Sequence, residues 1–229
     1  MIDFNLIIRY SVAMIEDNPS SLNMANRFRG YMPVVIDVET AGFDAKKDAL
    51  LEVAAVIVSM DDKGHLYRDK THSCHIEPFK GANLDPEALA FNGIDPYHPF
   101  RMAKPEKEGM QEIFKAVRQA LKLNDCKRAI LVGHNAPFDL NFINAAAVRC
   151  EIKRNPFHPF STFDTVTLGG VMYGQTVLAR IGELAGIKWD HDAAHSAVYD
   201  AEQTADLFCK MTNRWQTLAM LDETSNSFG

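Results

Sequence analysis

Two acidic residues stand in an otherwise apolar stretch near the start of the chain. Asp37 and Glu39 belong to the β-branched run VVIDVE at 34–39, which predicts a buried strand. Side chains two positions apart on a strand point to the same face, so the two carboxylates would lie side by side. Like charges that close repel, and their burial without partners is costly. A divalent cation bound between the two carboxylates would offset this repulsion. The alternative is that both acids simply lie at the solvent-exposed end of the strand and bind no metal.

A third acid, Asp139, follows the apolar run AILVG at 129–133. We expect a strand there and then a helix, with Asn135 as its N-cap and Pro137 in its first turn. Asp139 would lie in that first turn, where the helix dipole favours a negative charge. Taken alone, this structural role is sufficient to explain Asp139. A cap role likewise explains Asp164, which precedes another short helix.

His195 and Asp200 form the last element of the pattern. The sequence predicts a helix from about 196 to 215. Its apolar stripe comprises Val198, Ala201, Ala205 and Phe208. Asp200 lies on the flank of this stripe, close to the core side, where an acid needs a partner. A continuous helix would turn His195 about 140° away from Asp200. His195 can therefore serve the same site only from a loop before the helix, where a lone histidine is otherwise solvated.

The three elements are more specific together than singly. In chain order they read Asp37-x-Glu39, Asn135-x-x-Phe138-Asp139 and His195-x4-Asp200. Four hard oxygen donors suit Mg²⁺ or Mn²⁺, whereas a zinc hydrolase would need a set of ligands rich in histidine or cysteine. This order and spacing resembles the DEDD exonucleases, in the DEDDh subgroup, whose third motif carries a histidine.

Longer blocks resemble one family of that subgroup, bacterial ribonuclease T. They are residues 26–42 (NRFRGYMPVVIDVETAG), 81–95 (GANLDPEALAFNGID), 154–165 (RNPFHPFSTFDT) and 174–178 (GQTVL). The resemblance covers roughly residues 26–218. It implies an α/β protein with the RNase H-like exonuclease fold, a mixed central β-sheet flanked by α-helices. It also implies a homodimeric 3′–5′ exoribonuclease that trims single-stranded 3′ ends of tRNA and other stable RNA precursors and also acts on single-stranded DNA.

The resemblance assigns the acids and the histidine to a two-metal mechanism that releases nucleoside 5′-monophosphates. Two Mg²⁺ ions per active site, which Mn²⁺ could replace, would be bound by Asp37, Glu39, Asp139 and Asp200, with Asp37 bridging them. One ion would lower the pKa of a bound water and the other would stabilise the leaving 3′ oxygen. His195 would act as the general base.

The resemblance also predicts substrate contacts. Phe43, Phe91, Phe138 and Phe160 match phenylalanines that line the substrate cleft of the family, where aromatic faces stack on bases. Glu87 matches a residue that contacts the terminal base and is linked to poor removal of a 3′ cytosine. The alternatives are plain core packing for each phenylalanine and an ordinary exposed helix acid for Glu87.

Several basic residues are candidates for an RNA-binding patch. The resemblance to ribonuclease T implies that such a patch on one subunit feeds RNA to the active site of the other. Arg27 and Arg29 resemble that patch most directly. Further candidates are Lys115, Arg118, Lys122, Lys153 and Arg154. A solvated charged face is the alternative for each cluster.

Several elements must position these residues. Strands are predicted at 34–39, 50–60 and 129–133, with 72–77 pairing as a hairpin with the second. Helices are predicted at 86–92, 106–123, 137–150, from 163–165 onward, at 177–185 and at 196–215. Strands that come early and then alternate with helices favour a mixed sheet flanked by helices. We expect an N-terminal extension over 1–25 that the domain does not need, an exonuclease domain over 26–220 and a tail over 221–229.

Composition limits the function classes. The chain has 229 residues, 47% hydrophobic residues and a net charge of -6, which exclude disordered, fibrous and histone-like proteins. No run of eighteen apolar residues occurs, so no membrane association is expected. Four scattered cysteines indicate reduced thiols in a cytoplasmic protein. A DNA proofreading-type exonuclease and a non-catalytic nucleic-acid-binding module remain the rival functions.

Overall fold

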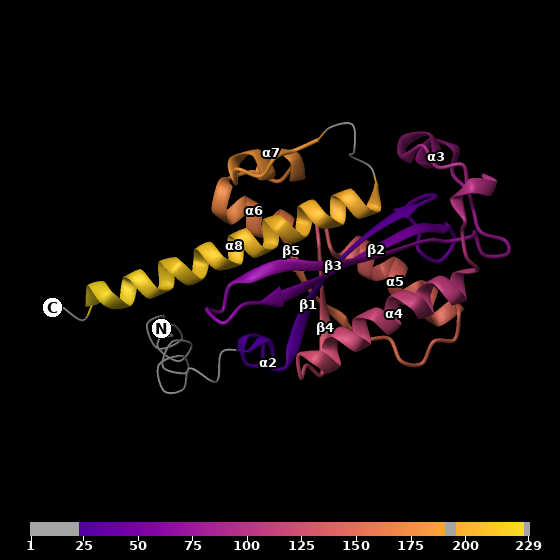
Figure 1. Ribbon diagram of the computed structural model, residues 1–229. Coiled ribbons are helices and arrows are strands. Elements are labelled where there is room, and N and C mark those ends of the chain that lie inside the picture. The colour runs from indigo at the N-terminus through magenta and orange to yellow at the C-terminus, as the bar shows by residue number, and fades with distance from the viewer. Residues whose placement is uncertain (1–22, 191–195, 227–229) are drawn as a thin grey trace.

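The computed structural model describes residues 23–190 and 196–226. Its centre is a mixed five-stranded sheet in the order β3-β2-β1-β4-β5 (Figure 1). The strands are β1 (Tyr31–Thr40), β2 (Leu50–Met60), β3 (Leu66–His75), β4 (Arg128–Gly133) and β5 (Phe157–Asp164). The first three pair antiparallel, whereas β1 with β4 and β4 with β5 are parallel. The predicted mixed sheet is confirmed.

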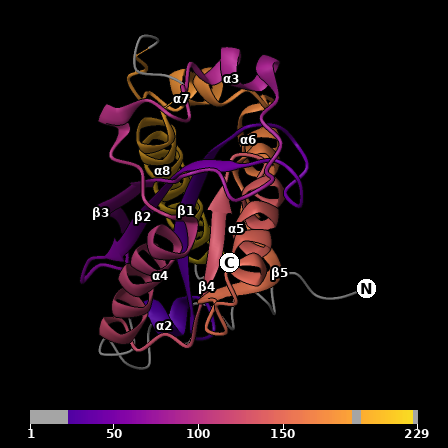
Figure 2. The same ribbon diagram turned by 90° about the vertical axis from the view of Figure 1, so that its right-hand side faces the viewer.

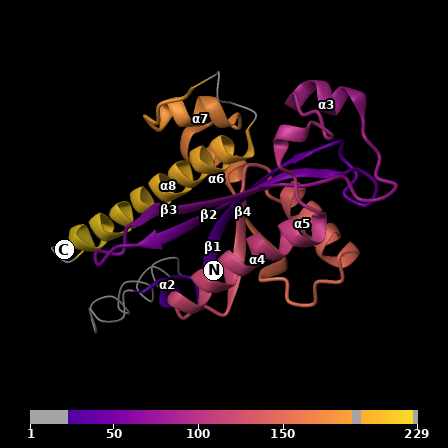
Figure 3. The same cartoon turned by 45° about the vertical axis from the view of Figure 1, so that its right-hand side comes forward.

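Helices cover both faces of this sheet. The helical elements of the described residues are α2 (Met24–Arg27), α3 (Pro86–Asn92), the 3-10 turn η2 (Pro99–Arg101), α4 (Glu106–Leu123), α5 (Pro137–Arg149), α6 (Thr165–Tyr173), α7 (Leu178–Leu184) and α8 (Ala197–Asn226). The long helix α8 crosses one face, and α4 and α5 lie against the other (Figures 1 and 3). Burial from both sides explains why β1 and β2 are almost continuously apolar.

The predicted elements agree with the structure in most places. The hairpin of β2 and β3 is confirmed, although β3 begins at Leu66 and not at residue 72. Helix α4 buries the apolar stripe that predicted it. The sequence did not indicate β5 or α2, and α8 continues past residue 215 to Asn226. β5 is a half-exposed edge strand that contains a proline, so it lacks the usual pattern.

The predicted N-cap of α5 is wrong. Ala136 occupies that position and no side chain caps the helix. Asn135 instead has a left-handed backbone, with φ 72°, and its N–H donates to Asp164 Oδ1 at 3.0 Å. Asp164 also accepts from Val166 N at 3.1 Å, so its predicted role as the cap of α6 is confirmed. One carboxylate thus holds both the turn before α5 and the start of α6.

The parallel strands end at one end of the molecule, beneath α3 and α7 (Figure 2). Ligands of open α/β sheets bind beyond the carboxyl ends of the strands. Glu39, near the end of β1, therefore lies at the edge where a site is expected.

All four cysteines are free thiols, three of them buried and Cys126 partly so. Among the helices of residues 23–190 and 196–226, none is long and apolar enough to cross a bilayer.

Candidate active site

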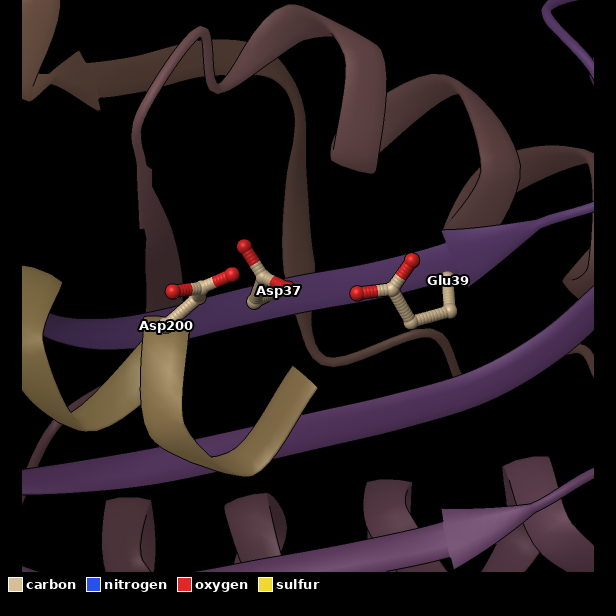
Figure 4. Close-up of side chains that lie close together, drawn as sticks. All are labelled: Asp37, Glu39 and Asp200. Carbon is tan, nitrogen blue, oxygen red and sulfur yellow. The ribbon is translucent and has the colours of Figure 1, made fainter. Parts of the chain in front are cut away.

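Three acidic side chains from two elements converge over the sheet. Asp37 and Glu39 project from one face of β1, and Asp200 projects from the first turn of α8, which crosses that face (Figure 4). One carboxylate oxygen from each lies within 4.8 Å of those of the other two. The period of the strand and the approach of the helix thus bring together residues that are more than 160 positions apart in sequence.

Asp139 supplies a fourth carboxylate beside this group. It lies in the first turn of α5, is 5% exposed, and its Oδ1 accepts a hydrogen bond from Val38 N at 3.1 Å. The N–H of Val38 lies between the two acids of β1 in sequence. Gly133 leaves room for the approach of α5, because a Cβ there would make a tight contact of 3.0 Å with both Asp139 Oδ2 and the Cα of Ala136. The structure therefore brings all four predicted acids to one place.

A set of polar contacts fixes the part of α8 that carries Asp200. Arg68 on β3 forms ion pairs with Glu202 and Asp206, the latter at 3.0 Å. Thr71 Oγ1, also on β3, donates to Glu202 Oε1 at 2.6 Å. Because Glu202 is two residues beyond Asp200, these contacts fasten the first turns of the helix to the sheet.

The carboxylates of the cluster make ionisation unfavourable for one another. Burial and then the charge of Asp139 raise the pKa of Asp37 well above its usual range. Burial, followed by the charges of Glu52 and Asp200, raises the pKa of Glu39 to about 8. Burial also raises the pKa of Asp139. Bound cations reverse such shifts. An all-carboxylate donor set with these electrostatics fits a divalent metal ion.

Glu52 is a member of this acidic region that sequence reasoning missed. It lies on β2 directly opposite Glu39 and is 8% exposed. Its Oε2 lies 3.7 Å from His75 Nδ1, and burial raises its pKa while His75 and Arg101 oppose that change. The signal was present, since Glu52 interrupts the apolar run of β2 just as Asp37 interrupts that of β1.

His195, the predicted general base, lies outside the described residues. The chain just before residues 191–195 is fastened to α8. The backbone N–H of Asp190 donates to the Tyr199 hydroxyl at 2.5 Å, and Trp189 packs edge-on against the Tyr199 ring with centroids 5.4 Å apart. Tyr199 immediately precedes Asp200, so this anchor lies next to the carboxylate cluster. The role of His195 stays a prediction.

Three of the four predicted substrate phenylalanines are exposed to solvent. Phe43, Phe91 and Phe160 are 86%, 73% and 79% exposed, which excludes core packing as their explanation. Phe138 is half-buried, and its ring contacts that of Phe43 with centroids 6.2 Å apart. Glu87 is exposed on α3. The part that these residues play in binding stays a prediction.

The two arginines of the predicted basic patch differ in their surroundings. Arg27 is half-buried, and its Nη1 donates to Gly64 O at 2.6 Å and to Gln216 Oε1 at 2.7 Å. Burial lowers the pKa of Arg27. Arg27 therefore ties α2 to the β2–β3 turn and to α8, a structural role that the sequence did not indicate. Arg29 is exposed with φ 56°.

The structure brings most of the remaining basic candidates together. Lys115, Arg118, Lys153 and Arg154 are among the residues that line a surface hollow of about 520 Å³. Arg118 Nη1 donates to the carbonyl of Arg154 at 3.0 Å, which joins α4 to the segment after α5. Lys122 is not part of the lining.

The cluster predicts how stability should respond to pH and metal. The pKa of Glu39 is about 8 in the fold against 4.5 ordinarily, so between these values the folded state holds a proton that the unfolded chain has lost. Stability of the metal-free protein should therefore be highest at the acidic end of this window and fall as pH rises to about 8. Mg²⁺ should offset the loss, so its stabilising effect should grow over the same window.

Thermal unfolding in EDTA and in Mg²⁺ from pH 5 to 8.5 measures this. We expect the gap in Tm to widen with pH, by about 2–4 °C for each kcal/mol of stabilisation by the metal. Glu39→Gln should reduce the widening. A gap that is constant or narrows with pH would contradict the assignment of this cluster as the metal site.

Comparison with known proteins agrees with the geometry. The exonuclease family model RNase_T matches residues 34–208. The chain is 60% identical over 205 residues to ribonuclease T of Marinobacter nauticus, covering 90% of this chain and 93% of that protein. It is 60% identical to ribonuclease T of Shewanella oneidensis, covering 85% and 88% of the two chains.

Solved structures of exonuclease I share the fold. One superposes with a TM-score of 0.63 at 18% identity, covering 85% of this chain and 43% of that one. A complex of the Escherichia coli enzyme with a dA16 oligonucleotide gives a TM-score of 0.63 at 17% identity, with 83% and 42% covered. The chain thus spans less than half the length of these enzymes. Its acid cluster, the family match and the identity over most of its length agree, and the chain belongs to the ribonuclease T family of 3′–5′ exoribonucleases.

Proposed function

We propose that this protein trims the single-stranded 3′ ends of tRNA and other stable RNA precursors and releases nucleoside 5′-monophosphates. The observation that carries the proposal is the convergence of Asp37, Glu39 and Asp200 within 4.8 Å, with Asp139 beside them. The 60% identity to proteins named ribonuclease T supports RNA as the substrate. Single-stranded DNA is a second proposed substrate, since exonuclease I of the same fold is seen with DNA oligonucleotides.

The four acids would bind two Mg²⁺ ions, or Mn²⁺ in their place, which when bound supply an activated water and stabilise the leaving 3′ oxygen. The remaining chemistry belongs to the chain. A ring nitrogen of His195 would accept the proton of the attacking water. Asp139 is buried and accepts a hydrogen bond from Val38 N, which would orient its carboxylate before the substrate arrives.

The terminal bases would be held by exposed aromatic faces. Phe43 and Phe138, which are close in sequence to Glu39 and Asp139, contact each other, and Phe91 presents its ring from α3. Asn92 Nδ2 donates to Thr40 O at 3.1 Å, which ties α3 to the end of the strand that carries Glu39. Stacking of this kind contributes about 1–3 kcal/mol per base and reads no base edge.

We further propose a homodimer, in which the basic patch of one subunit, Arg29 above all, guides RNA to the site of the other. The exposure of Arg29 and the grouping of Lys153 with the basic stripe of α4 support this surface. The four free thiols are consistent with the proposed cytoplasmic location.

Base selectivity should depend on Glu87. Glu87 and Phe91 lie four residues apart on α3, so both can face one terminal base. A carboxylate that accepts from the cytosine amino group would hold that base in a poorly reactive pose. Glu87→Ala should then raise the rate on 3′ cytosine relative to 3′ adenine, whereas Phe91→Ala should slow removal of every base.

Single-turnover cleavage of four RNAs that differ only in the 3′ nucleotide measures both effects. Glu108→Ala, which removes another first-turn helix acid, is the matched control. An unchanged cytosine-to-adenine ratio in Glu87→Ala would remove Glu87 from the account of specificity and leave the metal chemistry untouched.

Digestion of RNA labelled at its 3′ or its 5′ end tests the proposed function. With Mg²⁺, the 3′ label should appear at once in mononucleotides, whereas the RNA labelled at its 5′ end should shorten stepwise. EDTA should stop both reactions. Single-stranded DNA of the same sequence separates this function from DNA proofreading, because a proofreading enzyme would digest the DNA and spare the RNA. Binding without cleavage would indicate a non-catalytic module.

A further inference from the structure

A groove continues from the Phe43–Phe138 pair along the outer side of α5. It encloses about 980 Å³, and its lining is mostly apolar. One wall is the loop of residues 43–46 after β1. The other is a stripe of α5 formed by Phe138, Asn141, Ala145 and Val148. These four recur at helical spacing on one face, so at 1.5 Å per residue the wall is about 15 Å long.

Arg149 holds the two walls of this α5 groove together. Its guanidinium donates to Glu106 Oε2 at 2.9 Å and Oε1 at 2.6 Å, and to Ala45 O in the opposite wall at 3.1 Å. The same group lies 3.9 Å from the centre of the Phe79 ring. Glu106 is buried and the Arg149 side chain is 21% exposed, so the pair is largely shielded from solvent. The groove is therefore preformed, which lowers the entropic cost of binding.

The loop wall is fixed independently at its base. Asp48, 6% exposed, accepts from Asp44 N at 2.7 Å and from Asn83 Nδ2 at 2.8 Å. Gly42 is required there, because its φ is 150° and a Cβ would lie 2.2 Å from Asp48 Oδ2. The backbone next to Phe43 therefore has little freedom to close over the groove.

The chemistry of the lining matches single-stranded nucleic acid. Aromatic and apolar side chains offer faces for bases, Asn141 offers an exposed amide, and Lys46 offers an exposed cation for phosphate. The one acid of the lining, Asp44, pairs with Lys47 at 3.1 Å. Val148 remains 79% exposed at the far end, an apolar side chain that nothing within the described chain covers.

The groove is tied to the strand segment that carries the exposed Phe160. Asn144, which lines the groove, donates through Nδ2 to Pro159 O at 3.2 Å, and its Oδ1 accepts from Asn155 at 2.9 Å. These bonds fasten the strand that carries Phe160 to α5.

We propose that the α5 groove binds the nucleotides of single-stranded RNA that lie upstream of the 3′-terminal one. This inference rests on the proposed function and adds the path of the substrate. Stacked nucleotides rise about 3.4 Å each, so a wall of about 15 Å holds about four of them. The groove would therefore make affinity depend on RNA length over the first few nucleotides.

A charge placed at the far end of the groove tests this path. Val148→Glu puts a carboxylate where phosphates would pass, at an exposed position that the fold does not need. Val171→Glu on α6 is the matched control, since Val171 is 77% exposed outside the groove. For each variant, kcat/KM is measured on an eight-nucleotide RNA and on a dinucleotide. Val148→Glu should lower the ratio of kcat/KM on the eight-nucleotide RNA to kcat/KM on the dinucleotide by about fivefold, the upper range for one surface charge pair. Val171→Glu should leave this ratio unchanged.

Crosslinking gives a second measurement that does not depend on turnover. Inactive Asp37→Asn protein is irradiated with RNA that carries 4-thiouridine two to four positions from its 3′ end. We expect adducts within residues 43–46 and 138–149, which form the two walls. Adducts only at other residues, or an unchanged kcat/KM ratio in Val148→Glu, would contradict RNA binding in the α5 groove. Neither result would contradict the proposed exonuclease function. If Val148→Glu instead changed the oligomeric state in light scattering, the groove would be an interface between copies. A wild-type protein that digests neither RNA would contradict both proposals.

Discussion

Replacement of Asp37 by asparagine should abolish nucleotide release and at the same time stabilise the metal-free protein. Metal catalysis contributes several kcal/mol, and each 1.36 kcal/mol is a factor of ten, so the loss should be roughly 10³-fold or more. Stability should rise because Asp37 is a half-buried carboxyl whose ionisation is opposed by desolvation and by the charges of Asp139 and Glu39. Asp139→Asn and Asp200→Asn should also abolish activity with the fold retained.

Turnover in Mg²⁺ and Tm in EDTA at pH 8 measure the two effects. Asp62→Asn, which changes an exposed acid in the β2–β3 turn, is the control and should alter neither. Near-wild-type turnover in any of the three variants would refute the assignment of the acids. A fall in the Tm of metal-free Asp37→Asn would show that Asp37 supports the fold through contacts other than metal.

The second large effect concerns His195. His195→Ala should lower kcat by about 10²–10⁴-fold, the usual contribution of a general base. The Mg²⁺ concentration at half-maximal rate should change little, because His195 is proposed as a base and not as a ligand. His72→Ala, on β3, controls for loss of a histidine as such. A loss of Mg²⁺ affinity as large as that of Asp37→Asn would contradict this role.

Three of the four acids could be predicted because each of them breaks a local rule, whereas Asp139 obeys one and was selected only by the combined pattern. Asp37 and Glu39 share a face in an apolar strand, and Asp200 lies beside the apolar stripe of α8. Periodicity gives the direction of each side chain within its own element. It does not give the distance between elements, so the convergence of carboxylate oxygens from α8 and β1 within 4.8 Å had to come from the structure.

What the sequence did not predict depends on contacts between distant segments. Arg27 reads as a surface cation, yet it is bound by Gly64 and Gln216, which are 37 and 189 residues away. Asn135 has the composition of an N-cap, but the bond from its N–H to Asp164 turns its backbone to φ 72°. In both cases a tertiary hydrogen bond overrides a local preference.

The position of the metal centre follows from the four acids Asp37, Glu39, Asp139 and Asp200. Anomalous diffraction from crystals soaked in Mn²⁺ tests it most directly. We expect two anomalous peaks per chain, ligated by Asp37, Glu39, Asp139 and Asp200. Peaks ligated by other residues, with none at this cluster in crystals of active protein, would contradict it.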